Sequence, residues 1–182
     1  MTYIPAFSRD PRDVPTYGIA QAAHYLGLSA TTLRQWVLGR PYPTQEGGDF
    51  SEPLIKLPAP DRPWLSFTNL VEAYVLAALR REHRIQMLRP YLRRIEHDAT
   101  GLAERLFPLR RTAGADSPRV VVIDPYISFG KPTVAGTGVS VAILIDRFRS
   151  GEALTELADD YDMTMQQVEE AVRYGLPDEL AA

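Results

Sequence analysis

Residues 17–38, YGIAQAAHYLGLSATTLRQWVL, contain two apolar repeats of helical period on either side of a glycine. The first repeat places four residues on one helical face: Ile19, Ala22, Ala23 and Leu26. Gly27 tolerates the left-handed backbone that follows a helix, and Ser29 is suited to cap the next helix. The second helix has its own inward-facing set: Ala30, Leu33 and Val37. Two short helices joined by such a turn predict a helix-turn-helix.

The outward face of the second helix carries four polar side chains: Thr31, Thr32, Arg34 and Gln35. Thr and Gln can hydrogen-bond base edges, and Arg can bond guanine or phosphate. The N–H groups at the start of this helix, beside Ser29, can hold a phosphate directly. The alternative is a solvated helix face, because helix pairs with a glycine turn are common in proteins that do not bind DNA. Arg40 and Lys56, which flank the following segment, favour DNA binding.

That segment, residues 41–63, holds six of the 15 prolines and the Gly47-Gly48 pair, and is therefore expected to be irregular or a short hairpin. We expect residues 42–45 to pair with residues 54–57 across the two glycines. The result would be a wing beside the helix-turn-helix.

Two longer helices are predicted after the wing. The first begins at Ser66, because apolar residues keep helical spacing from Phe67 to Leu79. The second has Pro90 in its first turn and can continue to Leu106; its apolar stripe is Leu88, Tyr91, Leu92 and Ile95. This stripe either closes the core of its own domain or pairs with the same helix of a second subunit.

The C-terminal part follows a break at residues 108–118 that is typical of a linker. Residues 119–123 predict a strand, and the loop GKPTVAGTG, residues 130–138, adds a second strand around Thr133. Three helices follow, with the stripes Val141/Leu144/Ile145/Phe148, Leu154/Leu157/Ala158/Tyr161 and Met165/Val168/Val172. The predicted fold class is mainly α: residues 1–107 form a winged helix-turn-helix with long helices, and residues 119–182 a small β-hairpin plus a three-helix domain.

The composition excludes several classes of protein. The chain has no cysteine, which rules out disulfides, thiolate zinc sites and thiol nucleophiles. Its three histidines do not have the spacing of a metal site, and Gly130-Lys131 lacks the earlier glycine of a phosphate-binding loop. We therefore expect no catalytic residues, metal or cofactor, and no enzyme activity. The longest apolar run, residues 73–79, is too short to span a membrane, and the N-terminus lacks a secretory signal, so we expect a cytoplasmic protein.

These motifs resemble two known families. YGIAQAA at residues 17–23, LGLS at residues 26–29 and TLRQW at residues 32–36 resemble the N-terminal DNA-binding domain of MerR-type regulators. IDPYISFGKPTVAGTGVSV, from Ile123, and GEALTELADDYDMTMQQVEEAVRY, from Gly151, resemble the domain-of-unknown-function family 433. That family is found in VapB-type antitoxins encoded beside PIN-like toxins.

The resemblances imply a DNA-binding antitoxin of a type II toxin–antitoxin system, which neutralises a PIN-like ribonuclease toxin and represses its own operon. The implied partners are operator DNA, the cognate toxin and a second copy of the chain. The expected DNA contacts are Tyr17, Ser29, Thr31, Thr32, Arg34, Gln35, Arg40 and Lys56. The expected dimer interface is the stripe Leu88, Tyr91, Leu92 and Ile95. The expected toxin contacts are Arg147 and Arg149.

Two alternatives stay open: a MerR-like regulator that senses an organic ligand, and a protein-interaction module that does not bind DNA. The net charge of −3 does not separate them, because it hides two opposite halves. Residues 1–123 carry 16 basic and 12 acidic side chains, whereas residues 124–182 carry 4 and 11. The N-terminal half therefore suits a contact with DNA, and the acidic C-terminal half is expected to stay off it.

Overall fold

A computed structural model of the chain describes residues 10–44, 47–59, 61–82, 85–109, 114 and 116–176. The chain divides into two compact units, Met1–Leu92 and Arg93–Ala182. Both are built mainly from helices, with small two-stranded sheets beside them, as the sequence predicts. In the described ranges no helix is long and apolar enough to cross a membrane.

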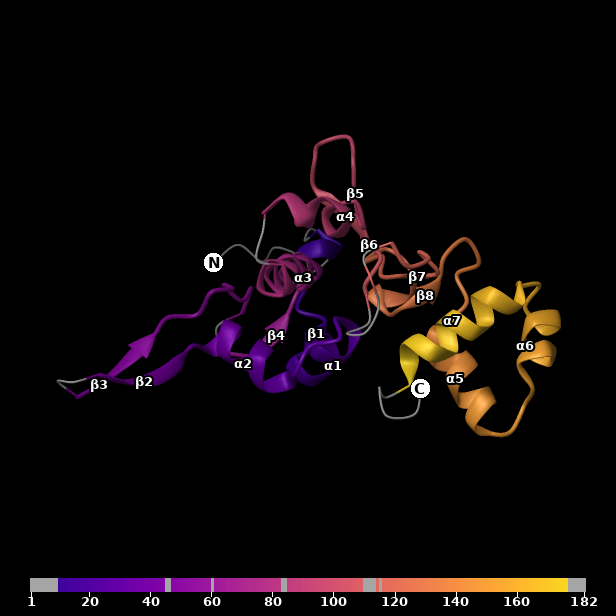
Figure 1. Ribbon diagram of the computed structural model, residues 1–182, viewed down its shortest axis with the longest axis horizontal. Helices are drawn as coiled ribbons and strands as arrows, with labels where there is room; N and C mark the ends of the chain where they lie inside the picture. Colours follow the sequence, from indigo (N-terminus) through magenta and orange to yellow (C-terminus); the bar gives the residue numbers. More distant parts are fainter. Residues whose placement is uncertain are drawn as a thin grey trace, which may run out of the picture. The chain divides into compact units, whose positions relative to one another are not determined.

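The first unit contains the predicted helix-turn-helix (Figure 1). Its two helices, α1 (Ile19–Tyr25) and α2 (Ala30–Leu38), pack against each other because each turns its apolar stripe inward. Leu33 is 0% exposed and Val37 3% exposed, whereas Ala30, the first residue of α2, is exposed. A short antiparallel pair, β1 (Tyr17–Gly18) with β4 (Trp64–Leu65), lies beside them.

Helix α3 (Phe67–Arg81) is the long helix predicted from Ser66. A capping box starts it: Ser66 Oγ accepts the N–H of Asn69, and Asn69 Oδ1 accepts the N–H of Ser66, each over 3.2 Å. Its buried apolar face consists of Phe67, Leu70, Ala73, Tyr74 and Ala78. Leu79, at the end of the predicted stripe, is exposed instead.

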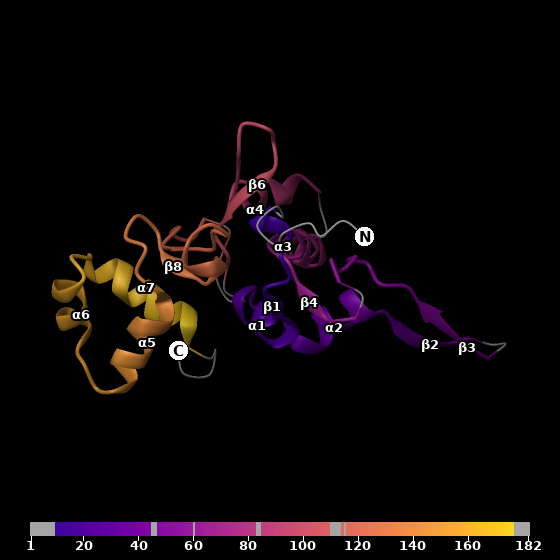
Figure 2. The ribbon, with the colours of Figure 1, turned by 180° about the vertical axis from the view of Figure 1, so that it is seen from behind.

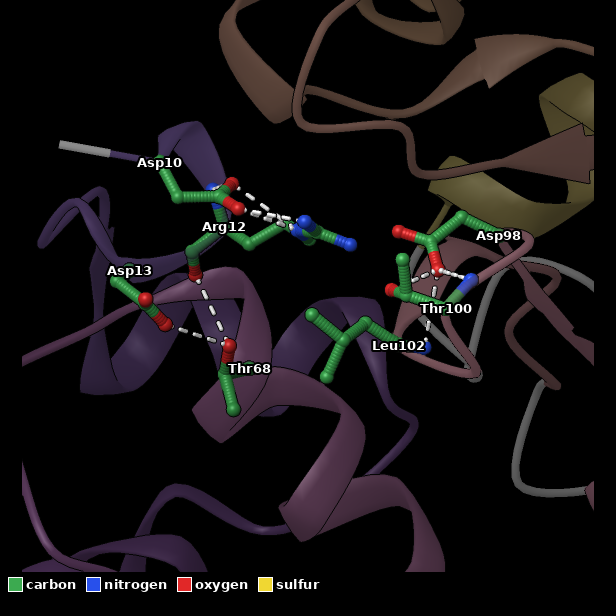
Figure 3. A network of polar contacts seen from close by, with 7 residues as sticks. All are labelled: Asp10, Arg12, Asp13, Thr68, Asp98, Thr100 and Leu102. Carbon is green, nitrogen blue, oxygen red and sulfur yellow. Dashed lines mark hydrogen bonds and ion pairs between the residues drawn. The ribbon is translucent and has the colours of Figure 1, made fainter. Parts of the chain in front are cut away.

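A 3₁₀ turn before β1, Pro11–Asp13, is fastened to α3 (Figure 3). Thr68 Oγ1 donates to Asp13 Oδ1 over 2.9 Å and contacts the carbonyl oxygen of Arg12 over 3.3 Å. Asp10 caps the turn by accepting the N–H of Arg12 over 3.0 Å and also binds its guanidinium. These bonds order the segment that leads into the helix-turn-helix.

The wing is a hairpin of β2 (Arg40–Thr44) and β3 (Gly47–Ser51), which extends away from α2 (Figure 1 and Figure 2). The sequence prediction of the return strand at residues 54–57 is wrong. Residue 42 pairs with Asp49, and both glycines belong to β3. Residues 45–46, between the two strands in sequence, lie outside the described residues. The reason is that Leu54 and Ile55 donate their N–H groups to Trp36 O, over 2.8 and 3.0 Å, and are not available to β2.

Both edges of this hairpin are protected against pairing with another strand. Pro41 and Pro43 have no N–H to offer on β2. On β3, the N–H of Phe50 donates to the carboxylate of its own neighbour, Asp49 Oδ1, over 2.8 Å. At residues 41, 43 and 50, the described part of the hairpin therefore offers no free N–H to another strand.

The long helix predicted from Leu88 to Leu106 is wrong. The first unit ends with a 3₁₀ turn, Ile85–Leu88, and a single helical turn, α4 (Arg89–Leu92). The second unit begins with a hairpin of β5 (Ile95–His97) and β6 (Ala103–Leu106). Asp98 makes the turn between them, because its Oδ1 accepts the N–H groups of Thr100 and Leu102 over 2.8 and 3.1 Å (Figure 3). These bonds replace the helical ladder.

Long-range hydrogen bonds tie this hairpin to the rest of the second unit. Leu106 and Ile123 exchange two backbone hydrogen bonds, of 3.0 and 2.8 Å. Arg94 is buried and donates to the carbonyl oxygens of Phe107 and Ser117, over 2.8 and 2.7 Å. The units therefore divide between Leu92 and Arg93, upstream of the linker expected at residues 108–118, of which 110–113 and 115 lie outside the described residues.

The rest of the second unit matches the prediction of a hairpin and three helices. β7 (Val121–Val122) pairs antiparallel with β8 (Thr133–Val134). The three helices are α5 (Val141–Arg149), α6 (Leu154–Asp160) and α7 (Met165–Gly175). Their apolar stripes meet in one core, in which Leu144, Leu157 and Val168 are 0% exposed. The predicted capping box of Thr164 and Gln167 starts α7.

Gly39 joins α2 to the wing, and its backbone conformation makes it important for stability. Its φ of 75° and ψ of −176° lie in a region that essentially only glycine adopts, and a Cβ there would lie 2.3 Å from the carbonyl oxygen of Ser51. We expect Gly39→Ala to lower the free energy of unfolding by about 2 kcal/mol or more in urea denaturation followed by circular dichroism.

Gly48→Ala is the matched control in the same hairpin. A Cβ at Gly48 would meet no atom within 4 Å, so the free energy of unfolding should change by no more than about 0.5 kcal/mol. Equal losses for the two variants would contradict the hairpin geometry.

Candidate nucleic-acid interface

Helix α2 presents the polar face that the sequence predicts. Ser29, Thr31 and Arg34 are exposed, and Thr32 and Gln35 are half-buried. The burial of Leu33 and Val37 on the other side holds this face outward. The structure therefore brings five of the eight expected DNA contacts together on one helix and its cap.

The start of α2 is organised by three side chains. Ser29 Oγ accepts the N–H of Thr32 over 3.1 Å and donates to Thr32 Oγ1 over 2.8 Å. Arg80 Nη1, from the last turn of α3, donates to the same Thr32 Oγ1 over 3.3 Å. Because Thr32 Oγ1 accepts both bonds, its hydroxyl hydrogen is left as a donor. A guanidinium, a hydroxyl and the first N–H groups of a helix thus meet at one end of α2.

Arg80 is a residue that motif reasoning missed. It lies 48 residues after Thr32, so no local pattern connects the two. The signal that could have found it is the pair of exposed arginines, Arg80 and Arg81, that ends α3. Cations at the C-terminal end of a helix also suit its dipole.

Arg40 and Lys56 are both exposed beside α2. Arg40 begins β2 directly after Gly39. Lys56 follows buried Ile55, and its carbonyl oxygen accepts a bond of 3.0 Å from Asn69 Nδ2 of α3. The base of the wing therefore carries two cations next to the C-terminal end of α2.

Tyr17 does not belong to this surface. It is 1% exposed, pairs with Leu65 in the β1–β4 sheet, and packs edge-on against the ring of Tyr25 at 6.2 Å between centroids. Its predicted role as a DNA contact is therefore corrected: burial of an aromatic ring in the core leaves its side chain no surface for a phosphate.

Basic and acidic side chains occupy different parts of the wing. No acidic residue occurs between Asp13 and Glu46, a stretch that contains Arg34 and Arg40. Beyond it, Asp49 is held in its charged form, because the N–H of Phe50 and the hydroxyl of Tyr42 both donate to its carboxylate, over 2.8 and 2.9 Å. The two bonds keep the pKa of Asp49 below its ordinary value. The base of the wing is therefore the part suited to a polyanion.

The predicted dimer stripe is largely internal. Leu88, Tyr91 and Ile95 are each 6–7% exposed, and Leu92 alone of the four is exposed. Tyr91 is also fixed by polar bonds: its hydroxyl donates to Glu82 Oε1 over 2.7 Å, and its carbonyl oxygen accepts from the Tyr74 hydroxyl over 3.3 Å. Because three of its four side chains are buried within the chain, the stripe as a whole is not an exposed surface for a second copy.

The two arginines expected to contact a toxin differ in their surroundings. Arg147 donates to Glu152 Oε2 over 2.7 Å and to Asp160 Oδ2 over 2.5 Å, and its guanidinium lies over the ring of Tyr161. These carboxylates raise the pKa of Arg147 and engage it within the unit. Arg149 is exposed. Across the described part of the chain, no cluster of three His, Asp or Glu side chains could hold a metal ion.

Two protein-family models match the chain. Residues 15–92 match the family described as "Putative DNA-binding HTH domain", and residues 121–175 match "Protein of unknown function (DUF433)". One match falls in each of the two units. The first match spans the helix-turn-helix, wing and α3, and the second spans β7 through α7.

Two curated relatives are similar over nearly their whole length. "Putative antitoxin VapB45" of Mycobacterium tuberculosis (strain ATCC 25618 / H37Rv) is 26% identical, over 88% of this chain and 93% of the relative. "Uncharacterized protein Rv2308" of the same strain is 23% identical, over 89% and 90%. The crystal structure of Rv2018 from Mycobacterium tuberculosis is 23% identical, with a TM-score of 0.62 over 88% of this chain and 98% of that one, and shares the fold.

The bonds to Asp49 make the stability of the hairpin depend on pH. A carboxyl whose pKa is lowered on folding stabilises the hairpin above its unfolded pKa, and this stabilisation is lost as the pH falls through the folded pKa. Carboxyl NMR titration should therefore give Asp49 a pKa below that of an ordinary aspartate, and Tyr42→Phe should raise it. Tyr126→Phe, which changes an exposed tyrosine in the other unit, is the control. An ordinary pKa in the unmodified chain would contradict the observed bonds.

Proposed function

We propose that this chain is the DNA-binding antitoxin of a type II toxin–antitoxin system, which represses its own operon and neutralises a PIN-like ribonuclease. The main support for DNA binding is the exposed polar face of α2, where Ser29, Thr32 and Arg80 are hydrogen-bonded together at the start of the helix. The similarity to a relative named "Putative antitoxin VapB45" along most of both chains supports the antitoxin part. On this proposal the chain has no enzymatic activity of its own and needs no cofactor.

In the proposed complex, α2 lies in the major groove as the recognition helix, in the manner of MerR-type domains. The N–H groups of its first turn, together with the Thr32 hydroxyl and the Arg80 guanidinium, bind a phosphate. Arg34 and Gln35, on the outward face, contact bases or the adjacent backbone. Arg40 and Lys56 bind phosphates where the wing begins.

A homodimer is part of the proposal, because two recognition helices about 34 Å apart match the two halves of a palindromic operator. Its contact surface would have to exclude Leu88, Tyr91 and Ile95, which are buried within the chain. Self-repression then follows from occupation of the promoter by the dimer.

Toxin binding is assigned to the second unit. Its acidic character disfavours DNA, and it would repel the acidic metal site of a PIN-like nuclease as well. It is therefore proposed to contact the rim of that site instead, or to reach the acidic site itself through Arg149, which is exposed. Arg147, which is engaged with Glu152 and Asp160, serves the fold of the unit instead.

The DNA-binding part is tested with the chain's own promoter. Fluorescence anisotropy should show that Arg34→Ala weakens binding by at least about tenfold, because a guanidinium contact to a base or phosphate is lost. If Arg34 contacts a phosphate, the slope of log K against log salt should also become shallower by about 1.

Arg149→Ala is the matched control for Arg34→Ala. It removes the same side chain from an exposed helical position in the other unit, and promoter affinity should stay unchanged. Binding by the unmodified chain with a salt slope near zero, or equal losses for both variants, would contradict the proposal.

The antitoxin part is tested by co-expression with the product of the adjacent reading frame. We expect the two proteins to copurify and the partner's ribonuclease activity to be suppressed in the complex. Arg34→Ala should leave this complex intact, because the DNA-binding face lies in the other unit. Failure to form any complex would contradict the antitoxin assignment while leaving the DNA-binding part standing.

A further inference from the structure

The second unit exposes a short run of apolar side chains that neither its core nor the DNA-binding proposal uses. The loop formed by residues 124–131, called here the 124–131 loop, connects β7 to β8. Phe129 is 88% exposed, Tyr126 56% and Ile127 40%. Single exposed apolar residues are common, but three within four positions form a local apolar patch, and such patches mark interaction sites.

The 124–131 loop is held rigidly in this exposed form. Asp124 is buried, and its Oδ2 accepts from Arg105 Nε over 3.0 Å while its Oδ1 accepts the N–H of Tyr126 over 2.8 Å. Two successive turns follow: the N–H of Gly130 donates to Ile127 O over 2.9 Å, and that of Lys131 to Ser128 O over 3.1 Å. The loop therefore does not need to be ordered when a partner binds.

The backbone beneath Phe129 is unfavourable for that residue. Ser128 and Phe129 have φ values of 50° and 54°, in the left-handed region that bulky residues rarely adopt. Glycine or asparagine would fit this backbone better. A large aromatic side chain is thus kept in solvent on a backbone that disfavours it, which is typical of positions retained for binding.

The charge of the unit indicates the kind of partner. Residues 116–176 carry ten acidic and five basic side chains. Two of the basic ones are paired internally, Arg147 with Glu152 and Asp160, and Arg173 with Glu170 over 2.7 Å. Such a surface repels nucleic acid and attracts a basic protein.

We propose that the 124–131 loop anchors the partner protein, with Phe129 inserted into an apolar cleft that is rimmed by Lys and Arg side chains. This inference rests on the proposed function, because a ribonuclease must surround its active site with cations in order to hold RNA. The acidic unit would occupy that cationic rim, and the aromatic side chains would supply the central apolar contact that holds most interfaces together.

The test is Phe129→Asn in the full chain. Asn suits the left-handed backbone, so the variant should fold as stably as the original chain while losing the aromatic anchor. Binding to the adjacent reading frame's product, measured by biolayer interferometry, should weaken by at least about tenfold, mostly through faster dissociation. Leu54→Asn is the control, because Leu54 is an apolar side chain 65% exposed in the other unit.

Each outcome decides between the inference and its alternatives. If Phe129→Asn binds the partner as tightly as the original chain, the inference is overturned but the proposed function is not. If the unmodified chain forms no complex, both the inference and the antitoxin part of the proposed function are overturned. If the variant instead changes the sedimentation of the chain alone, or its affinity for promoter DNA, the loop serves a second copy or nucleic acid and the inference is wrong. An association rate that does not fall with increasing salt would contradict the basic rim.

Discussion

The burial of Leu33 and Val37 is the constraint on which the proposed DNA-binding surface depends. It fixes the rotation of α2, and thereby which of its side chains face solvent. The Ser29 cap sets where the helix starts, and the bond from Arg80 to Thr32 ties that start to the end of α3. Gly39 then turns the chain directly into the wing, so that Arg40 follows α2 closely. A modest set of packing and capping interactions therefore gathers polar and cationic groups that are far apart in the sequence.

The division of charge between the two units agrees with the two different partners proposed for them. The first unit has ten basic and eight acidic side chains, and the second has ten and 15. Arg34, Arg40, Lys56 and Arg80 lie where α2 meets the wing and α3. In the second unit, Arg147 and Arg173 pair with carboxylates of the same unit. The acidic net charge of the whole chain is therefore compatible with the proposed binding of DNA by one unit and of a basic protein by the other.

Helices α1, α2, α3, α5, α6 and α7 were predictable from the sequence because their apolar residues repeat with the helical period of 3.6. Local side-chain caps mark the starts of α2, α3 and α7. The region after Leu88 was not predictable, because a short turn followed by a strand satisfies the same spacing of Leu88, Tyr91 and Ile95. What separates the two solutions is long-range: the bonds of Leu106 to Ile123 and of Arg94 to distant carbonyls. The polar face of α2 was predictable for the same reason as the helix. The contribution of Arg80 and the burial of Tyr17 depend on tertiary contacts and were not.

The start and outer face of α2 are proposed to contact the promoter, whereas the second unit is proposed to stay off it. The most direct measurement is a ¹H–¹⁵N correlation spectrum of the full chain with and without a duplex of its own promoter. Binding should shift the amides of residues 29–35 together with those of Arg40, Lys56 and Arg80, and leave residues 116–176 largely unchanged. Shifts concentrated in the second unit, or none along α2, would contradict the account.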